Sequence, residues 1–252
     1  ELNNYLEKFK NKFYLKYLRI DFTINKSNKI DELLKNNNLL RVLYKRSGST
    51  QIECDLNQSI ESILKNCDRK WRYNHNRALK NPVNIKVIKK PDTNLIYKLS
   101  KDLEREKKLG KGHSHDEVKN IFNNLEQQII YLQANDHNGK ILGFRAALYN
   151  ESRAWDLFAV STKLGRIHKS GYPLMIETIK EAQKRGIKKY YFIGDDPINL
   201  KNVFNFKKGL NGKISEYVGE IEWSNLFILK YFFNFIIYLL YSNLLPKKFQ
   251  RH

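Results

Sequence analysis

Residues 189–213 read KYYFIGDDPINLKNVFNFKKGLNGK, and this stretch decides the fold. Its first five residues form a short, mostly apolar run that predicts a buried strand. The strand ends in a turn that carries a glycine and Pro197, two residue types that reverse the chain direction. The stretch then reaches a Phe-Lys pair at 206–207 and closes with two further glycines. We therefore expect a strand, a tight turn and a glycine-bearing return here.

Three more strands precede this stretch, and we place them at 129–134, 142–149 and 155–160. A turn at 136–139 joins the first two, so the strands pair as an antiparallel meander. A helix over 173–184 follows the meander, and Gly186 suits its C-terminal cap. This order predicts an α+β or mixed α/β fold in which helices flank a partly antiparallel sheet.

The composition points to a polyanionic partner. The chain has 252 residues and a net charge of +20, with 46 Lys and Arg against 26 Asp and Glu. Nucleic acid, a phosphorylated precursor and an acidic membrane all fit this charge. The abundance of Lys, Asn and Ile is also what an AT-rich genome produces, so the charge has two explanations. A hydrophobic content of 41% excludes a disordered chain.

The side chains that bind metals are sparse. Cys54 and Cys67 are too few for a disulfide scaffold or a four-cysteine zinc site, and they fit a reducing cytoplasm. Segment 113–117 holds two histidines and two acids, but their spacing matches no recognised ligand set. Its Ser-x-x-Glu pattern instead predicts a helix-capping box. We expect no metal, and no sequence motif of the common hydrolases or nucleotide-binding loops is present.

A basic turn at residues 160–171, VSTKLGRIHKSG, leads from a strand into a helix. Backbone N–H groups and the helix dipole make such a helix start suited to anions. In GNAT acyltransferases this turn reads Arg/Gln-x-x-Gly-x-Gly/Ala and holds the pyrophosphate of coenzyme A. Arg166, Lys169 and Gly171 resemble that pattern, with a lysine in place of the first glycine. The lysine adds charge, but its side chain obstructs close approach of the backbone to a phosphate.

The C-terminal part of the deciding stretch resembles the Fem family, the aminoacyl-tRNA-dependent transferases that build peptidoglycan cross-bridges. Their pattern F-K-x-x-F-G-G is similar to residues 206–212, FKKGLNG, with Leu210 and Asn211 as departures. Upstream segments resemble the family in the same order: 50–56, 72–78 with His75 at an Ile position, 139–149, 155–161 and Gly186. The resemblance covers roughly residues 18–223. It implies a GNAT-like fold with a splayed sheet.

The resemblance also implies roles for several side chains. The lysine of the family's Phe-Lys pair stabilises the oxyanion of aminoacyl transfer, which assigns that role to Lys207. Phe206 then shapes the pocket for the acyl group or the terminal adenosine. Asp195 and Asp196 are candidates for a general base or a hydroxyl anchor. Their place in a turn before Pro197 favours the alternative that they are cap and turn residues.

Residues 57–79 read mostly as a helix with a basic face. Arg72 and Arg77 lie on this face and are candidate contacts for phosphates of a nucleic acid or a diphosphate. An ordinary solvated helix surface explains the same pattern. The helix and the Lys169 turn are thus the candidate substrate-binding surfaces.

We expect three parts in the chain. Residues 1–56 correspond to a partial or reduced first GNAT-like domain, 57–223 to the acyltransferase domain, and 224–252 to a hydrophobic helix with a basic tail. The chain has no initiator Met, which fits a fragment or a trimmed start.

The hydrophobic C-terminal segment, 226–245, approaches the length of a bilayer span, but Lys230 and Asn234 interrupt it. With Tyr238 and Tyr241 they form a narrow polar stripe on a helical wheel. Such a helix could lie in the membrane interface, cover the domain or bind a partner. The following basic residues Lys247, Lys248 and Arg251 suit an anionic membrane surface through 226–251.

The leading hypothesis is amide formation by an acyltransferase that takes an amino acid from aminoacyl-tRNA. The acceptor is an amino group of a phosphorylated or lipid-linked cell-envelope precursor, either peptidoglycan or a surface glycan. No cofactor is then needed, and the enzyme is peripheral at the inner face of the cell membrane. One alternative is an N-acyltransferase that uses acyl-coenzyme A and an amino sugar. Another is a non-catalytic basic module that binds nucleic acid or membranes.

Overall fold

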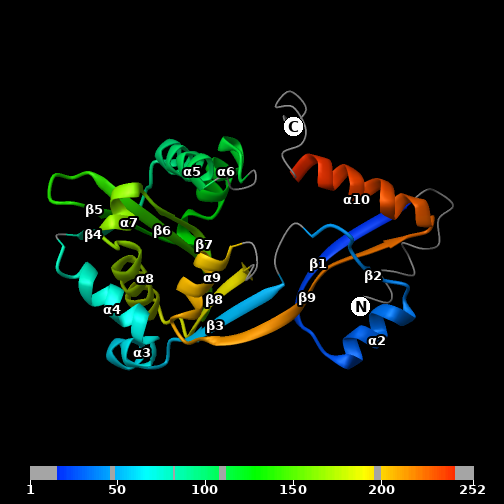
Figure 1. Cartoon of the computed structure of the whole chain (residues 1–252), viewed down its shortest axis with the longest axis horizontal. Coiled ribbons are helices and arrows are strands. Elements are labelled where there is room, and N and C mark those ends of the chain that lie inside the picture. Colours follow the sequence, from blue (N-terminus) through cyan, green and yellow to red (C-terminus); the bar gives the residue numbers. More distant parts are fainter. Residues whose placement is uncertain (1–15, 46–48, 82, 108–111, 196–199, 242–252) are drawn as a thin grey trace. The chain divides into compact units, whose positions relative to one another are not determined.

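The computed structural model describes residues 16–45, 49–81, 83–107, 112–195 and 200–241. The chain divides into two units, and Figure 1 shows their elements. The smaller unit comprises 1–49 and 216–252, and the larger unit comprises 50–215. Asp196, one of the candidate site residues, lies outside the described residues.

The larger unit is built on a mixed sheet. Its strands are, in spatial order, β3 (Thr50–Asp55), β8 (Lys189–Asp195), β7 (Arg153–Ser161), β6 (Ile141–Asn150), β5 (Ile129–Asn135) and β4 (Asn84–Val87). The β7–β8 pair is parallel, and the other neighbouring pairs of this series are antiparallel. The predicted mixed class and the predicted meander β5–β6–β7 are confirmed.

Helices cover the two faces of this sheet. They are α3 (Ile60–Asn66), α4 (Arg69–Ala78), α5 (Thr93–Lys107), α6 (His115–Asn124), the 3₁₀ turn η1 (Glu126–Gln128), α7 (Lys163–Ile167), α8 (Gly171–Lys184) and α9 (Lys201–Lys208). The Ser114–Glu117 capping box of α6 is present as predicted. Gly186 ends α8 with a φ of +75°, the left-handed conformation expected of it.

The helix expected over 57–79 is in fact two helices. Cys67 has extended backbone angles and ends α3, and Asp68 precedes α4. The Asp68 N–H donates to the Gly209 carbonyl at 2.8 Å, so the break joins this corner to the end of α9. A helical period alone does not reveal a two-residue break of this kind.

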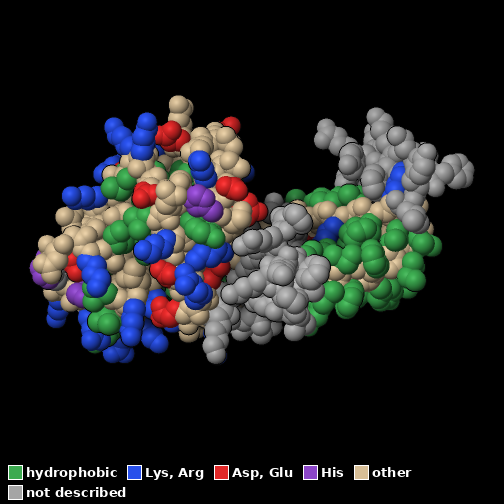
Figure 2. Space-filling model, turned by 90° about the horizontal axis from the view of Figure 1, so that it is seen from above, with side chains coloured by type: hydrophobic (Ala, Val, Ile, Leu, Met, Phe, Trp, Pro, Cys, Tyr) green, Lys and Arg blue, Asp and Glu red, His purple; other side chains and the backbone are tan. Residues whose placement is uncertain are grey.

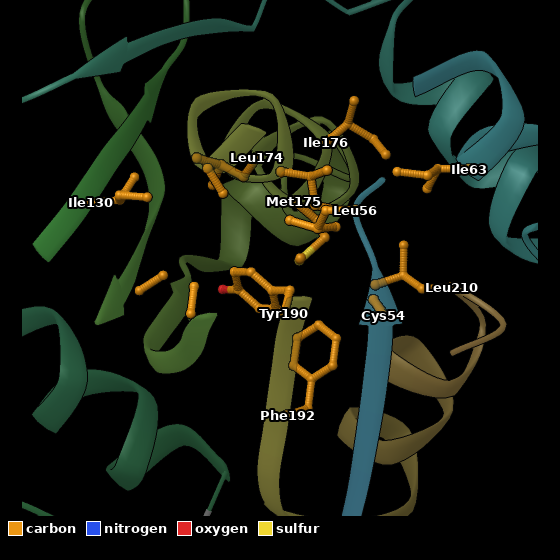
Figure 3. Close-up of a cluster of buried hydrophobic side chains, with 14 of the residues drawn as sticks. Cys54, Leu56, Ile63, Ile130, Leu174, Met175, Ile176, Tyr190, Phe192 and Leu210 are labelled. Carbon is orange, nitrogen blue, oxygen red and sulfur yellow. The ribbon is translucent and has the colours of Figure 1, made fainter. Parts of the chain in front are cut away.

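Alternation along β5 explains why both faces of the sheet are buried. Ile130 and Leu132 point into one core with α8, whereas Ile129 and Tyr131 point into another with α5 and α6. In the first core, Leu174, Met175 and Ile176 of α8 lie over Tyr190 and Phe192 of β8 (Figure 3). These β8 rings are fully buried, so the strand that carries them is held firmly in the sheet.

The smaller unit has its own sheet and core. Its elements are β1 (Tyr17–Asn25), α2 (Asn28–Asn36), β2 (Leu40–Arg41), most of β9 (Lys213–Ser224) and α10 (Phe227–Tyr241). Strand β9 pairs antiparallel with both β1 and β2. Leu34, Val218 and Trp223 belong to its apolar core. None of the helices in the described ranges has the length and apolar character needed to cross a bilayer.

The unit boundaries differ from the expected division at two places. Residues 50–55 form a strand that pairs with β8, so they belong to the larger unit rather than to the N-terminal part. Residues 216–224 pair with β1, so they join the smaller unit. In both places strand pairing between residues far apart in sequence decides the membership.

Gly165 allows the turn before α8 to form. A methyl group at this position would overlap the carbonyl of Leu142 and lie 2.8 Å from Ser170 Oγ. We expect Gly165→Ala to lower the free energy of unfolding by about 2 kcal/mol, the usual cost of forcing an extra carbon into a packed site. Urea denaturation followed by circular dichroism measures this. Lys163→Ala is the control, because Lys163 is exposed and lies on α7, the short helix that also contains Gly165. It should change the free energy of unfolding by less than about 0.5 kcal/mol. Equal stabilities would contradict the packing argument.

Candidate active site

Strands β7 and β8 separate after a short stretch of pairing. Their parallel register runs from Arg153↔Lys189 to Trp155↔Tyr191, although β7 continues to Ser161 and β8 to Asp195. In the same region the β6–β7 register shifts, because Ala146 faces Phe158 whereas Ala147 faces Asp156. This β-bulge adds one residue to β7 and bends it. The sheet is therefore splayed next to Asp156.

Asp156 is the centre of a buried polar cluster. Its carboxylate forms an ion pair with Arg145 of β6, and both side chains are less than one-tenth exposed. The Tyr190 hydroxyl of β8 donates to Asp156 Oδ1 at 3.0 Å. Burial, assisted by the Asp156 charge, raises the pKa of Tyr190 well above its ordinary value. The phenol therefore stays protonated and remains a donor.

Lys207 of α9 is the third partner of Asp156. Its Nζ lies 3.8 Å from Asp156 Oδ2, and its side chain is 13% exposed. The same Nζ lies 5.3 Å from the centre of the Phe192 ring, a cation–π distance. The helix that follows β8 thus brings an ammonium group to the place where β7 and β8 separate.

Phe206 belongs to an aromatic cluster beside this ammonium. Its carbonyl accepts a hydrogen bond of 3.1 Å from Trp71 Nε1 of α4. Its ring lies 5.1 Å from the Tyr172 ring of α8, and the Arg145 guanidinium lies 5.6 Å from it. A side chain at Gly209 would place its Cβ 2.6 Å from Trp71, so glycine is needed at this corner. These contacts fix the backbone on which Lys207 sits.

The basic turn at 160–171 contains α7, a short helix that the sequence did not reveal. Arg166 is engaged locally, because its guanidinium pairs with Glu106 and donates to the Ser161 carbonyl. Lys169 has a φ of +58°, the left-handed conformation that glycine prefers, and it is partly exposed. Gly171 begins α8. The turn thus retains the glycine-like backbone while carrying a lysine.

The family assignment comes from comparison with known proteins. The profile of the FemAB family matches residues 93–236, which is more than half of the chain.

The chain belongs to the FemAB family.

It is an acyltransferase, and enzymes of this family use aminoacyl-tRNA as a substrate without a cofactor. The matched range contains Asp156, Tyr190 and Lys207, so the buried cluster lies inside the family region. No curated protein sequence matches the chain.

Solved structures confirm the fold. The crystal structure of FemX has a TM-score of 0.72 at 15% identity, covering 95% of this chain and 78% of that one. A C-terminal domain assigned to a lysylphosphatidylglycerol synthetase of Agrobacterium fabrum scores 0.58 at 10% identity, covering 97% and 78%. A tandem GNAT protein from the clavulanic acid biosynthesis pathway scores 0.51 at 9% identity, covering 83% and 62%. The GNAT-like fold expected from the sequence is thereby confirmed.

The remaining candidate residues of this FemAB chain are dispersed. Arg72 donates to the carbonyls of Lys65 and Cys67 and so caps the end of α3. Arg77 is exposed near the end of α4. Asp195 pairs with Thr50 through the β8 backbone. Among the described residues, no group of three or more His, Cys, Asp or Glu is arranged to hold a metal ion.

Sequence reasoning missed Arg145, Asp156, Tyr190 and Trp71 as site residues. A signal existed for the ion pair. Arg145 and Asp156 are single, opposite charges inside otherwise apolar segments of adjacent strands, GFRAAL and AWDLFAV. Burial of such charges requires a partner, because an isolated ion is costly in the interior. Trp71 carried no signal beyond its place on an apolar helix face.

His75 of α4 supports the aromatic cluster and makes it sensitive to pH. Its ring stacks on Trp71 at 5.8 Å, and the residue is 6% exposed. Burial lowers the pKa of His75 below its ordinary value of about 6.5. The unfolded chain therefore binds a proton more readily at this residue, and protonation favours unfolding.

We expect the free energy of unfolding to fall as pH drops below about 6.5, by at most about 1.4 kcal/mol per pH unit for this one group. In His75→Ile that decline should be smaller, because the titrating ring is gone. Urea titrations at a series of pH values measure the slope. His137→Gln is the control, since His137 is exposed in the β5–β6 turn. The same slope in His75→Ile as in the wild type would remove His75 as its source.

Proposed function

We propose that this enzyme transfers an amino acid from aminoacyl-tRNA to an amino group of a cell-envelope precursor and forms an amide. The observation that carries the proposal is the position of Lys207. Its ammonium lies 3.8 Å from the buried Asp156 carboxylate, beside the separation of β7 and β8. Asp195 and Asp196 stay proposed, as a general base or an anchor for a substrate hydroxyl.

The reaction needs a fixed positive charge. The acceptor nitrogen attacks the ester carbonyl of the aminoacyl-tRNA, a C–N bond forms, and the carbonyl oxygen gains negative charge. The ester C–O bond then breaks, the ribose oxygen leaves, and the proton lost by the amine ends on that oxygen. A preorganised ammonium stabilises the oxyanion, a charge that exists only near the transition state. We assign this role to Lys207, and to Phe206 the shaping of the pocket beside it.

The burial of the cluster favours this role. Arg145 and Lys207 both form ion pairs with Asp156, and Tyr190, which donates to the same carboxylate, is neutral. The Lys207 side chain is only 13% exposed, and in such a place an ammonium attracts an anionic oxygen more strongly than it would in water.

The turn at 160–171 favours tRNA over coenzyme A as the donor. Arg166 is committed to Glu106 and to the Ser161 carbonyl, and the side chain of Lys169 occupies the position of a family glycine. A pyrophosphate would lose the close backbone approach that a glycine permits. Lys169, Arg72, Arg77 and the α8 start at Gly171 remain proposed contacts for tRNA or diphosphate groups, whose binding weakens with salt.

The acceptor is proposed to be phosphorylated or lipid-linked, and the enzyme to act at the inner face of the membrane. The net charge of +20 suits both a diphosphate and an anionic surface. The names of the structural neighbours FemX and lysylphosphatidylglycerol synthetase support an envelope acceptor.

We expect the purified enzyme to transfer label from aminoacyl-tRNA, and not from acetyl-coenzyme A, to an amine-bearing envelope precursor. Lys207→Met should reduce turnover about 10²- to 10³-fold, the usual effect of losing one oxyanion-stabilising group. The matched control is Lys208→Met, the neighbouring exposed lysine of α9, which should retain turnover. Quench-flow or radiolabel assays with seryl-, alanyl- and glycyl-tRNA provide the measurement.

The alternatives give distinct results. Transfer from acetyl-coenzyme A that also requires Lys207 would retain the site and change the donor. Binding of tRNA without transfer from any donor would favour the non-catalytic module. Equal turnover in the two lysine variants would remove Lys207 from the mechanism.

Tyr190 is proposed to act as a positioning residue through Asp156. We expect Tyr190→Phe to reduce kcat about 10-fold, because the loss of one hydrogen bond of about 1 kcal/mol lets the Asp156 carboxylate move relative to Lys207. The KM for aminoacyl-tRNA should stay constant, since the hydroxyl faces Asp156 rather than the donor. Tyr191→Phe on the same strand is the control. A rise in KM of about tenfold with kcat unchanged, in place of the expected fall in kcat, would exclude the positioning role.

A further inference from the structure

Helix α10 lies in the smaller unit with its polar side chains inward and its apolar ones outward. Lys230 and Asn234, the residues that interrupt the hydrophobic segment, are only 8% and 4% exposed. Several exposed side chains share one arc of about 140° on the helical wheel, next to the buried stripe of Lys230 and Asn234. They are Phe227, Ile228, Tyr231, Phe232, Phe235 and Tyr238, and we call them the apolar face of α10. Figure 2 shows the hydrophobic patch over this helix.

Hydrogen bonds on the inner side fix this orientation. The Asn234 side chain donates to Glu222 Oε2 at 2.6 Å and accepts from the Tyr44 N–H at 3.1 Å. The Tyr17 hydroxyl donates to the same Glu222 oxygen at 2.9 Å, and the Tyr17 ring stacks on Phe233 at 4.4 Å. Rotating the helix to hide its apolar face would break both Asn234 bonds and take one hydrogen-bond donor from the buried Glu222, which is unfavourable.

The C-terminal segment that carries the apolar face has formal charges of one sign. Residues 225–252 contain no Asp or Glu, and Lys247, Lys248 and Arg251 follow α10 in the sequence. On β9, which precedes α10, Glu220 and Glu222 are buried, at 3% and 2% exposure. The segment thus combines exposed aromatic side chains on α10 with basic residues and no acidic ones in its sequence.

We propose that the apolar face of α10 docks on an anionic lipid surface, with the helix lying in the plane of the headgroups. Phe, Ile and Tyr side chains insert at the boundary between headgroups and acyl chains, and the following basic residues bind anionic headgroups. The 15 residues of α10 span about 22 Å, less than a bilayer core, which fits a flat orientation. A second copy of this segment would bring like charges together, so charge complementarity favours lipid. The inference does not depend on the donor or acceptor proposed above.

The test is co-sedimentation of the full 252-residue chain with vesicles. The vesicles contain phosphatidylglycerol and phosphatidylcholine in equal amounts, and vesicles of phosphatidylcholine alone serve for comparison. We expect binding to the anionic vesicles that weakens with salt. Ile228→Gln, Phe232→Gln and Phe235→Gln combined should weaken it about tenfold or more, because three apolar side chains no longer enter the interface.

A matched control separates this effect from general hydrophobicity. Leu79→Gln, Val87→Gln and Ile214→Gln remove three exposed apolar side chains of the larger unit and should leave vesicle binding unchanged. Lys207→Met should also bind vesicles normally. The α10 triple variant should keep its turnover on a soluble amine acceptor, so failure of docking and failure of the proposed function are distinguishable.

Three results would overturn the inference. The first is equal binding by the α10 triple variant and the wild type. The second is that the wild type sediments as a dimer without lipid whereas the triple variant sediments as a monomer. This result would assign the apolar face to a second copy of the chain. The third is vesicle binding that arises only after residues 1–15 are deleted, which would mean that this segment covers the face in the intact chain.

Discussion

The carboxylate of Asp156 is the constraint on which the candidate site depends. It lies among Arg145, Tyr190 and Lys207, three side chains from β6, β8 and α9, and it holds them through two charges and one hydroxyl. A buried carboxylate is costly unless several donors satisfy it. Moving any of the three partners away would leave the carboxylate with fewer donors, so the positions of the partners are fixed together with it. Because Lys207 is one of these partners, the stability requirement and the placement of a reactive ammonium are met by the same contacts.

Backbone features around Asp156 produce this arrangement. The β6–β7 register shifts at a bulge directly after Asp156, and pairing between β7 and β8 stops one residue before it, at Trp155 and Tyr191. Helix α9 then returns beside β8, and Trp71 anchors it through the Phe206 carbonyl. The glycine at 209 lets the Trp71 ring approach. The position of Lys207 is therefore determined by four elements that are far apart in the sequence.

The strands could be predicted from the sequence, whereas the contacts between residues far apart in the chain could not. Strands 129–134, 142–149 and 155–160 follow from local alternation and turns, and the structure confirms them. The Lys207 prediction came from a short motif, and it remains a prediction about catalysis. The Arg145–Asp156 pair depends on a bulge that shifts register by one residue, and the Trp71–Phe206 contact joins residues 135 apart. The break of the 57–79 helix at Cys67 is likewise set by tertiary packing against Gly209. Periodicity holds no information on such pairings.

Helix α10 shows a second limit of prediction from sequence. A helical wheel shows that Lys230 and Asn234 share a stripe, but a wheel does not say which side faces the protein. The common assumption places polar residues outward, and here it gives the opposite of the observed arrangement. The deciding residue is Glu222, which lies on β9 and needs the Asn234 amide as a donor. Because burial of one acid selects the orientation of the whole helix, the aromatic side chains are left at the surface. The same rule, that a buried charge recruits its neighbours, thus shapes the core of the larger unit and the outer face of the smaller one.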